Sequence, residues 1–336
     1  MLSLQKKDVL NRHIPLTLLG ITLTFSIQNA VADSQYGDWS TPVNLGVNFN
    51  SANRDGCQYV SSDGLTMYVA SDRPGGYGGM DLYVSKRADV NSTWGAPENL
   101  GPNINSEYWE ICPAFGKSGR VLYFTSERDG GCNDAEINDP NGSNPARRDI
   151  YMSTRDQKDI NDDFAWSTPV HLGCVDSGGF NSVKTDQGPS YNKDDQGNSY
   201  LYFSSNRDGG KGGHDIYRAK LNKDQQPDIT NIENVEELNT VKNDHRPMLR
   251  EDGLEVYIDS NRDVEPAGDH IYVATSKNAD EPFSTPELVQ SIADGSKDIN
   301  RRPTLGNDAT ELYYTANRAG GSGSVDVWVS TREKTE

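Results

Sequence analysis

The chain has 336 residues, and its 50 acidic and 32 basic side chains give a formal net charge of −18 at pH 7. An acidic surface of this kind should repel nucleic acid and anionic lipid, so we expect no nucleic-acid partner. The length is within reach of a single all-β domain.

The first 32 residues have the pattern of a secretory signal peptide. Basic residues precede an apolar run over residues 14–27, and Ala30-Val31-Ala32 is a small-residue cleavage site. The run is too short to span a bilayer. We therefore expect residues 1–32 to be removed and residues 33–336 to form one domain with no integral membrane segment. The expected location is periplasmic or secreted.

A repeat of about 55 residues occupies the rest of the chain. Its most regular part is a Tyr-containing segment that ends in arginine, and it occurs as TMYVASDR, VLYFTSER, YLYFSSNR, EVYIDSNR and ELYYTANR. Each copy contains four short segments rich in Tyr, Val, Ile, Phe and Thr, bounded by Gly, Asn, Asp and Pro, which is typical of strands. Five such copies predict an all-β protein, a five-bladed β-propeller of four-stranded antiparallel blades.

The chain begins with a fourth-strand segment and ends after a third strand. Residues 39–45 have the pattern W-x-x-P-x-x-L, which also follows the third strand at residues 94–100 and 166–172. The last copy stops at its third strand, over residues 325–330. We therefore expect the N-terminal strand to complete the last blade, which closes the ring and leaves no exposed sheet edge.

An acidic residue begins the innermost strand in four of the copies, at Asp55, Glu110, Asp186 and Asp244. These acids should ring one end of the central channel. Arginines occur in step with them, at Arg73, Arg128, Arg207 and Arg262. Because a guanidinium fork suits a carboxylate, the pattern favours structural ion pairs. The alternative is that the acids hold a cation, or act as the catalytic acid and base of a glycosidase.

The fifth copy departs from this pattern, because Asn300 replaces the ring acid. Basic residues gather in the same region, at Arg246, Arg301, Arg302 and Arg318. They predict a ligand-binding site at the channel mouth for a carboxylate, such as a uronic acid or a peptide C-terminus. The alternative is that Asp298 or Asp244 neutralises the unpaired arginine.

Two further segments stand out as candidate sites. Tyr108 and Trp109 are adjacent aromatics in a loop of the second copy, where they could stack on a sugar or grip a peptide, or pack under a neighbouring insertion. That insertion, residues 131–147, carries Asp134, Glu136 and Asp139, whose oxygens are a possible calcium site. A solvated acidic loop is the alternative. No other cofactor is expected.

Four cysteines in an exported chain allow three disulfide pairings. Cys132 and Cys174 lie in loops that should emerge on the same face of a propeller, so we favour a disulfide between them. Cys57 and Cys112 would be paired with each other or buried as thiols. There is no C-x-x-C pair to indicate zinc.

Two stretches, SSDGLTMYVASDRPGGYGGMDLY and YLYFSSNRDGGKGGHDIY, resemble the WD-repeat-like propeller repeats of the TolB type. The resemblance covers nearly all of the chain after the signal peptide and implies a propeller. Repeats of this type occur in binding proteins, enzyme accessory domains and envelope proteins. Our first interpretation is an exported, non-enzymatic binding module whose partner is an envelope or extracellular protein, or an acidic carbohydrate or peptide. The alternatives are a glycoside-active enzyme of the five-bladed type and a calcium-stabilised envelope protein.

Overall fold

The computed structural model describes residues 36–116, 118–133, 144–262, 268–278, 281–293 and 299–335. The expected signal peptide lies outside these ranges, as do the candidate calcium ligands Asp134, Glu136 and Asp139. Within the described ranges, no helix is both long enough and apolar enough to cross a membrane.

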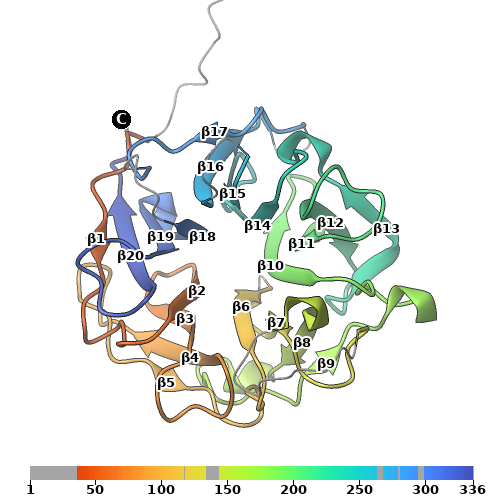
Figure 1. The fold of residues 1–336 in the computed structure, drawn as a ribbon, viewed down its shortest axis with the longest axis horizontal. Helices are drawn as coiled ribbons and strands as arrows, with labels where there is room; N and C mark the ends of the chain where they lie inside the picture. The colour runs from red at the N-terminus through yellow and green to blue at the C-terminus, as the bar shows by residue number, and fades with distance from the viewer. Residues whose placement is uncertain are drawn as a thin grey trace, which may run out of the picture. The chain divides into compact units, whose positions relative to one another are not determined.

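Five four-stranded antiparallel sheets stand as blades around a central axis (Figure 1). The first blade contains β2 (Asp55–Val60), β3 (Thr66–Ser71), β4 (Asp81–Lys86) and β5 (Glu98–Asn99). The second contains β6 (Glu110–Phe115), β7 (Val121–Ser126), β8 (Asp149–Thr154) and β9 (Val170–His171). The third contains β10 (Asp186–Lys193), β11 (Ser199–Ser205), β12 (Asp215–Leu221) and β13 (Pro227–Asn234). The fourth contains β14 (Asp244–Leu249), β15 (Glu255–Ser260), β16 (His270–Thr275) and β17 (Glu287–Leu288). The fifth contains β18 (Asn300–Gly306), β19 (Glu311–Ala316), β20 (Asp326–Thr331) and β1 (Val43–Asn44).

This arrangement confirms the predicted five-bladed, all-β propeller. The helical content of the described residues is five short 3₁₀ turns: η1 (Pro145–Arg147), η2 (Gln157–Asp159), η3 (Val175–Ser177), η4 (Glu236–Leu238) and η5 (Asn307–Ala309). The second strand of each blade packs against both neighbouring blades, and all six residues of β7 are buried. This explains why these segments are almost continuously apolar or aromatic.

The N-terminal strand completes the fifth blade, as predicted. Val43 faces Val329 and Asn44 faces Trp328 in antiparallel register between β1 and β20. The Asn50 side chain then pairs with the backbone of Val327 through two hydrogen bonds of 3.0 and 2.9 Å. The two ends of the described chain therefore share one sheet, and the ring has no open edge at this point.

Every innermost strand has a bulge in the same place. The pairing register shifts there in all five blades, and the bulged residue has a positive φ between 48° and 61°: Cys57, Cys112, Gly188, Arg246 and Arg302. A bulge bends a strand and re-aims its side chains. All five of these residues line the channel.

Candidate functional site

The acids that begin the innermost strands are completely buried and paired with arginines of their own blades. The nitrogen–oxygen distances are 2.6 Å for Arg73–Asp55, 3.2 Å for Arg128–Glu110, 2.6 Å for Arg207–Asp186 and 2.6 Å for Arg262–Asp244. Serine and threonine hydroxyls occupy further lone pairs, as Ser51 does on Asp55 at 2.7 Å. Burial raises the pKa of Glu110, although the charge of Arg128 opposes this shift. Inaccessible carboxylates of this kind cannot act on a substrate, so the catalytic and cation-binding alternatives do not fit them.

Two of the arginines expected to bind a ligand, Arg318 and Arg301, have partners within the protein. The Arg318 guanidinium donates to the side-chain oxygen of Asn300 at 2.8 Å and to the backbone oxygen of Ile292. An amide oxygen thus takes the place of the missing carboxylate. The Arg301 side chain forms an ion pair with Asp269.

The two adjacent aromatics also differ from the ligand-stacking expectation. Trp109 is buried, with the Arg54 guanidinium 4.6 Å from its ring centroid. The Tyr108 hydroxyl donates to Asp129 at 2.8 Å, and Arg147 lies 4.9 Å from the centroid of the Tyr108 ring. Both rings therefore serve packing within the protein, and Trp109 has no face free for a sugar.

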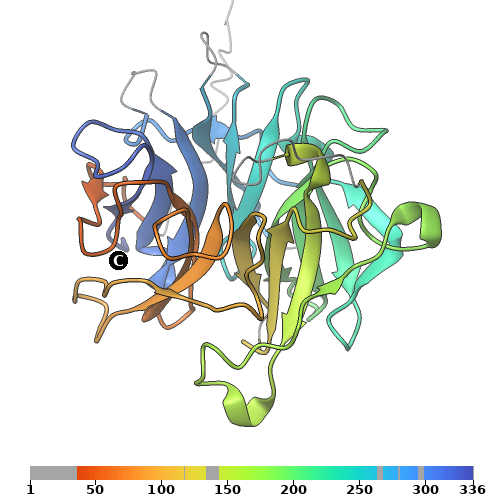
Figure 2. The same ribbon diagram turned by 60° about the horizontal axis from the view of Figure 1, so that its bottom comes forward.

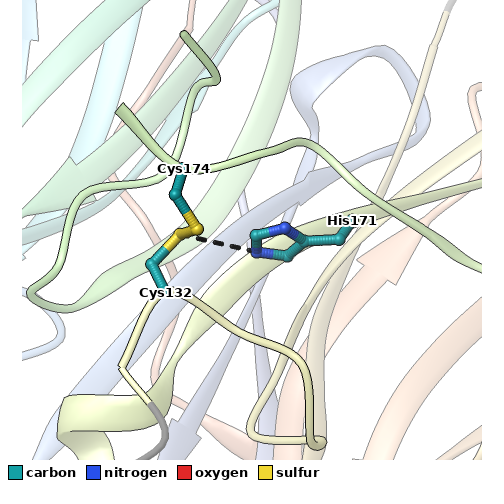
Figure 3. A group of neighbouring side chains, drawn as sticks. All are labelled: Cys132, His171 and Cys174. Carbon is teal, nitrogen blue, oxygen red and sulfur yellow. Dashed lines mark hydrogen bonds between the residues drawn. A yellow bond between two sulfur atoms is a disulfide. The ribbon is translucent and has the colours of Figure 1, made fainter. Parts of the chain in front are cut away.

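The cysteines form two disulfides, Cys132–Cys174 and Cys57–Cys112. His171 lies beside the first of these, with its Nε2 3.8 Å from the Cys132 sulfur (Figure 3). The same nitrogen is 2.8 Å from a carboxylate oxygen of Asp149. Because disulfide sulfurs are not thiolates, this cluster does not fit a metal ion.

A large cavity, of about 1140 Å³, occupies the channel. Its lining runs from the bulges of the innermost strands to the turns that follow them, as in residues 57–63 and 246–252, and the ring acids are not part of it. The connection between β8 and β9, which contains η2, projects from the lower face in Figure 2 and contributes Ile160, Asn161 and Asp163 to the lining. The cavity is therefore at the opposite end of the channel from the ring acids.

Aromatic side chains form part of the cavity wall. The rings of Tyr59 and Phe115 are stacked with centroids 4.9 Å apart, and Tyr68 lies 4.6 Å from Phe115. Tyr191 lies on the third blade. Apolar ring faces beside polar groups are typical of pockets that bind small molecules and sugars.

The carboxylates that line the cavity fall into two groups. Three of them are paired with cations: Asp163 with Lys86, Asp252 with Arg250, and Asp308 with Lys334. The other four have no cationic partner within the described part of the chain: Asp63, Asp194, Asp195 and Glu251. The sequence did not single out these four, because nothing in it distinguishes an acid in a channel-facing turn from an ordinary solvated turn.

Two of the unpaired acids affect the pKa of one tyrosine. Burial raises the pKa of the Tyr59 hydroxyl, and the negative charges of Asp63 and then Glu251 raise it further. Asp63 belongs to the turn after β2 of the first blade, whereas Glu251 belongs to the turn after β14 of the fourth. Two exposed carboxylates from different blades thus line the same cavity as Tyr59.

A buried trio of His245, Asp259 and Asp269 lies within metal-binding distance of one another. Asp259 already accepts from Arg246 at 2.7 Å, and Asp269 is paired with Arg301. These two guanidiniums compensate the two negative charges and would repel a cation. The donor set therefore does not fit a metal ion.

No protein-family profile matches the chain, and no curated protein matches it. Several solved structures do match the chain. One is an endo-arabinase from Bacteroides thetaiotaomicron VPI-5482, with a TM-score of 0.54 and 16% identity over 89% of this chain and 99% of the other. Another is an α-L-arabinofuranosidase from Lactobacillus brevis, with a TM-score of 0.55 and 13% identity over 86% and 94%. A putative TolB from Agrobacterium tumefaciens matches with a TM-score of only 0.42 and 12% identity over 85% and 78%.

At these identities the comparisons show a shared fold, that of a five-bladed β-propeller. They also correct our first interpretation. The first interpretation was a non-enzymatic binding module, but the two matching propellers with TM-scores above 0.5 named above are an endo-arabinase and an α-L-arabinofuranosidase.

Proposed function

We propose that the protein is a glycoside hydrolase that cleaves a polysaccharide or oligosaccharide in the channel cavity. The observation that supports this most directly is the pair of cavity carboxylates, Asp63 and Glu251, which share the cavity lining with Tyr59 and form no ion pair among the described residues. Glycoside hydrolysis needs two such carboxyl groups on either side of the scissile bond.

The two carboxyl groups have different roles in the proposed hydrolysis. Of Asp63 and Glu251, the carboxyl group that keeps its proton protonates the leaving oxygen of the glycosidic bond. The ionised one activates water, or attacks the sugar carbon directly. The Tyr59 hydroxyl stays protonated because burial raises its pKa. The stacked rings of Tyr59 and Phe115 offer an apolar wall to a sugar ring.

A panel of polysaccharides tests this function. The purified protein would be incubated with arabinan, arabinoxylan, xylan, β-glucan and pectic polysaccharide, and the release of reducing ends would be measured. We expect release from at least one of them and a loss of that release in Glu251→Gln. The matched control is Glu98→Gln, an exposed acid on the outer strand β5. If none of the polysaccharides is cleaved, the proposed function is wrong.

We also propose that the protein acts outside the cytoplasm. Its two disulfides persist in an oxidising compartment and would be reduced by cytosolic thiols. Fractionation of the producing cells, with detection of the protein in the periplasm or medium, tests this location.

A further inference from the structure

Three arginines from three blades converge on one part of the channel. Arg246 and Arg302 are the bulged residues of β14 and β18, and both line the cavity. Arg148 immediately precedes β8 and donates to the side chain of Gln187 at 2.9 Å. Gln187 adjoins Gly188, and a Cβ added to Gly188 would lie 2.8 Å from Cγ of Arg246. Arg148 and Arg246 therefore flank the same bulge of β10.

Among the described residues, two of these three guanidiniums are paired with a carboxylate. Arg148 is paired with the buried Glu127 at 2.9 Å, and Arg246 with the buried Asp259 at 2.7 Å. The second oxygen of Asp259 accepts the backbone N–H of Arg302 at 3.0 Å. The Arg302 side chain has no acceptor among the described residues, and its buried Nε lacks a hydrogen bond. Among the described residues, one positive charge is thus left without a counterion.

The surroundings of Arg302 increase the cost of this charge. Burial lowers the pKa of Arg302 well below its ordinary value, and the positive charges of Arg246, Arg301 and Arg148 lower it further. Because a guanidinium stays protonated in proteins, the folded chain bears this repulsion. A bound anion would relieve it.

Among the five bulges, only those of the fourth and fifth blades carry a charged residue, which is arginine in both. The equivalent residues of the first three blades are the disulfide-bonded Cys57 and Cys112, and Gly188. None of these adds a charge to the channel. Arg246 and Arg302 adopt the same left-handed backbone, with φ of 48° and 60°, a conformation that costs free energy for a residue with a long side chain. The fold itself therefore does not require arginine at this position.

We propose that the guanidinium of Arg302, with Arg246 beside it, binds the carboxylate of an acidic sugar residue in the cavity, such as a uronic acid. A guanidinium fork donates two parallel hydrogen bonds to a planar carboxylate, and one carboxylate matches the single negative charge that is missing among the described residues. This inference rests on the proposed function for the sugar part of the ligand, because the same cavity contains Asp63, Glu251 and Tyr59.

Calorimetric binding of oligogalacturonate tests the inference, with the methyl ester of the same oligosaccharide and a neutral arabino-oligosaccharide as comparisons. We expect the free acid to bind at least 10-fold more tightly than the methyl ester, with an advantage that shrinks as salt is added. Arg302→Gln should lose at least 10-fold in affinity for the free acid and little for the ester. Arg302→Lys, which keeps the charge without the fork, should show an intermediate loss.

Arg301→Gln is the matched control, since this neighbouring arginine is paired with Asp269 and does not line the cavity. Its affinity for the free acid should stay within about 3-fold of the parent. Equal binding of acid and ester, or an unchanged affinity in Arg302→Gln, would overturn the inference. Binding needs no turnover, so Arg302-dependent binding without cleavage would reject only the hydrolase proposal. Cleavage of neutral arabinan with no preference for acidic sugars would reject only the carboxylate site.

Discussion

Arg87 and Glu311 form a two-point ion pair between the first and fifth blades, with nitrogen–oxygen distances of 3.0 and 2.7 Å. The Arg87 guanidinium also lies 4.5 Å from the centroid of the Trp94 ring. The fifth and fourth blades are joined in the same way by Arg332, Glu255 and Trp39. The ring is therefore held by arginine clamps between blades as well as by the strand that closes it.

Removal of the Arg87 clamp should destabilise the ring. The carboxylate of Glu311 is nearly buried, and Arg87→Gln removes its cationic partner. The free energy of unfolding, measured by urea titration, should therefore fall by about 3 kcal/mol. The control is Lys184→Gln, which removes an exposed pair with Asp208 and should cost less than about 1 kcal/mol. Equal losses in the two variants would show that the clamp does not stabilise the ring.

The pair between Arg207 and Asp186 should be equally sensitive. Asp186 is completely buried and also accepts from Ser182, so Arg207→Ala leaves an uncompensated charge in the protein interior. We expect a loss of about 3 kcal/mol or more in the free energy of unfolding. A loss under about 1 kcal/mol would mean that solvent screens this pair, and it would reopen a catalytic role for the ring acids.

Deletion of the closing strand should have a larger effect. A chain that begins at Val47 lacks β1 and Trp39, whose indole is buried against Tyr257 and donates to its hydroxyl at 3.3 Å. Compared with a chain that begins at Gln35, it should lose at least about 3 kcal/mol of stability, the cost of one buried tryptophan. Trp39→Ala separates the contribution of the side chain from that of the strand. An unchanged melting temperature in the shortened chain would contradict closure by β1.

Acid should destabilise the protein through His214. Burial and, to a smaller extent, the charge of His245 together lower the pKa of His214 from 6.5 to about 3. The unfolded chain therefore takes up this proton first, so stability is complete above about pH 6.5 and is lost as the pH falls toward 3. Between pH 7 and pH 5 the loss from this group should be about 2 kcal/mol. His214→Gln should reduce the pH dependence by that amount in urea titrations, and identical pH profiles would contradict it.

The propeller could be predicted from the sequence because the same four-strand pattern recurs five times, and four of the five arginines recur in step with an acid. The clamps could not, since Arg87 and Glu311 lie 224 residues apart and become neighbours only when the ring closes. The cavity was missed for a different reason. The repeat places loops at both ends of the channel, and no sequence pattern says at which end the side chains leave space.

The charge of the channel followed only partly from sequence. The surplus of arginine near blades four and five was visible, but its location was not. Arg318 donates a hydrogen bond to the amide oxygen of Asn300, and Arg301 forms an ion pair with Asp269. Arg148 could not be linked to this region, because its approach to Gln187 depends on the packing of the second blade against the third.

The kcat/KM of Glu251→Gln on the best substrate of the polysaccharide panel tests the central claim most directly. If Glu251 is one of two carboxylates that cleave a glycosidic bond, the variant should lose at least about 100-fold in kcat/KM while its melting temperature stays unchanged. Asp63→Asn should show a loss of similar size, and Glu98→Gln none. Equal kcat/KM values for the parent and Glu251→Gln would contradict catalysis in this cavity.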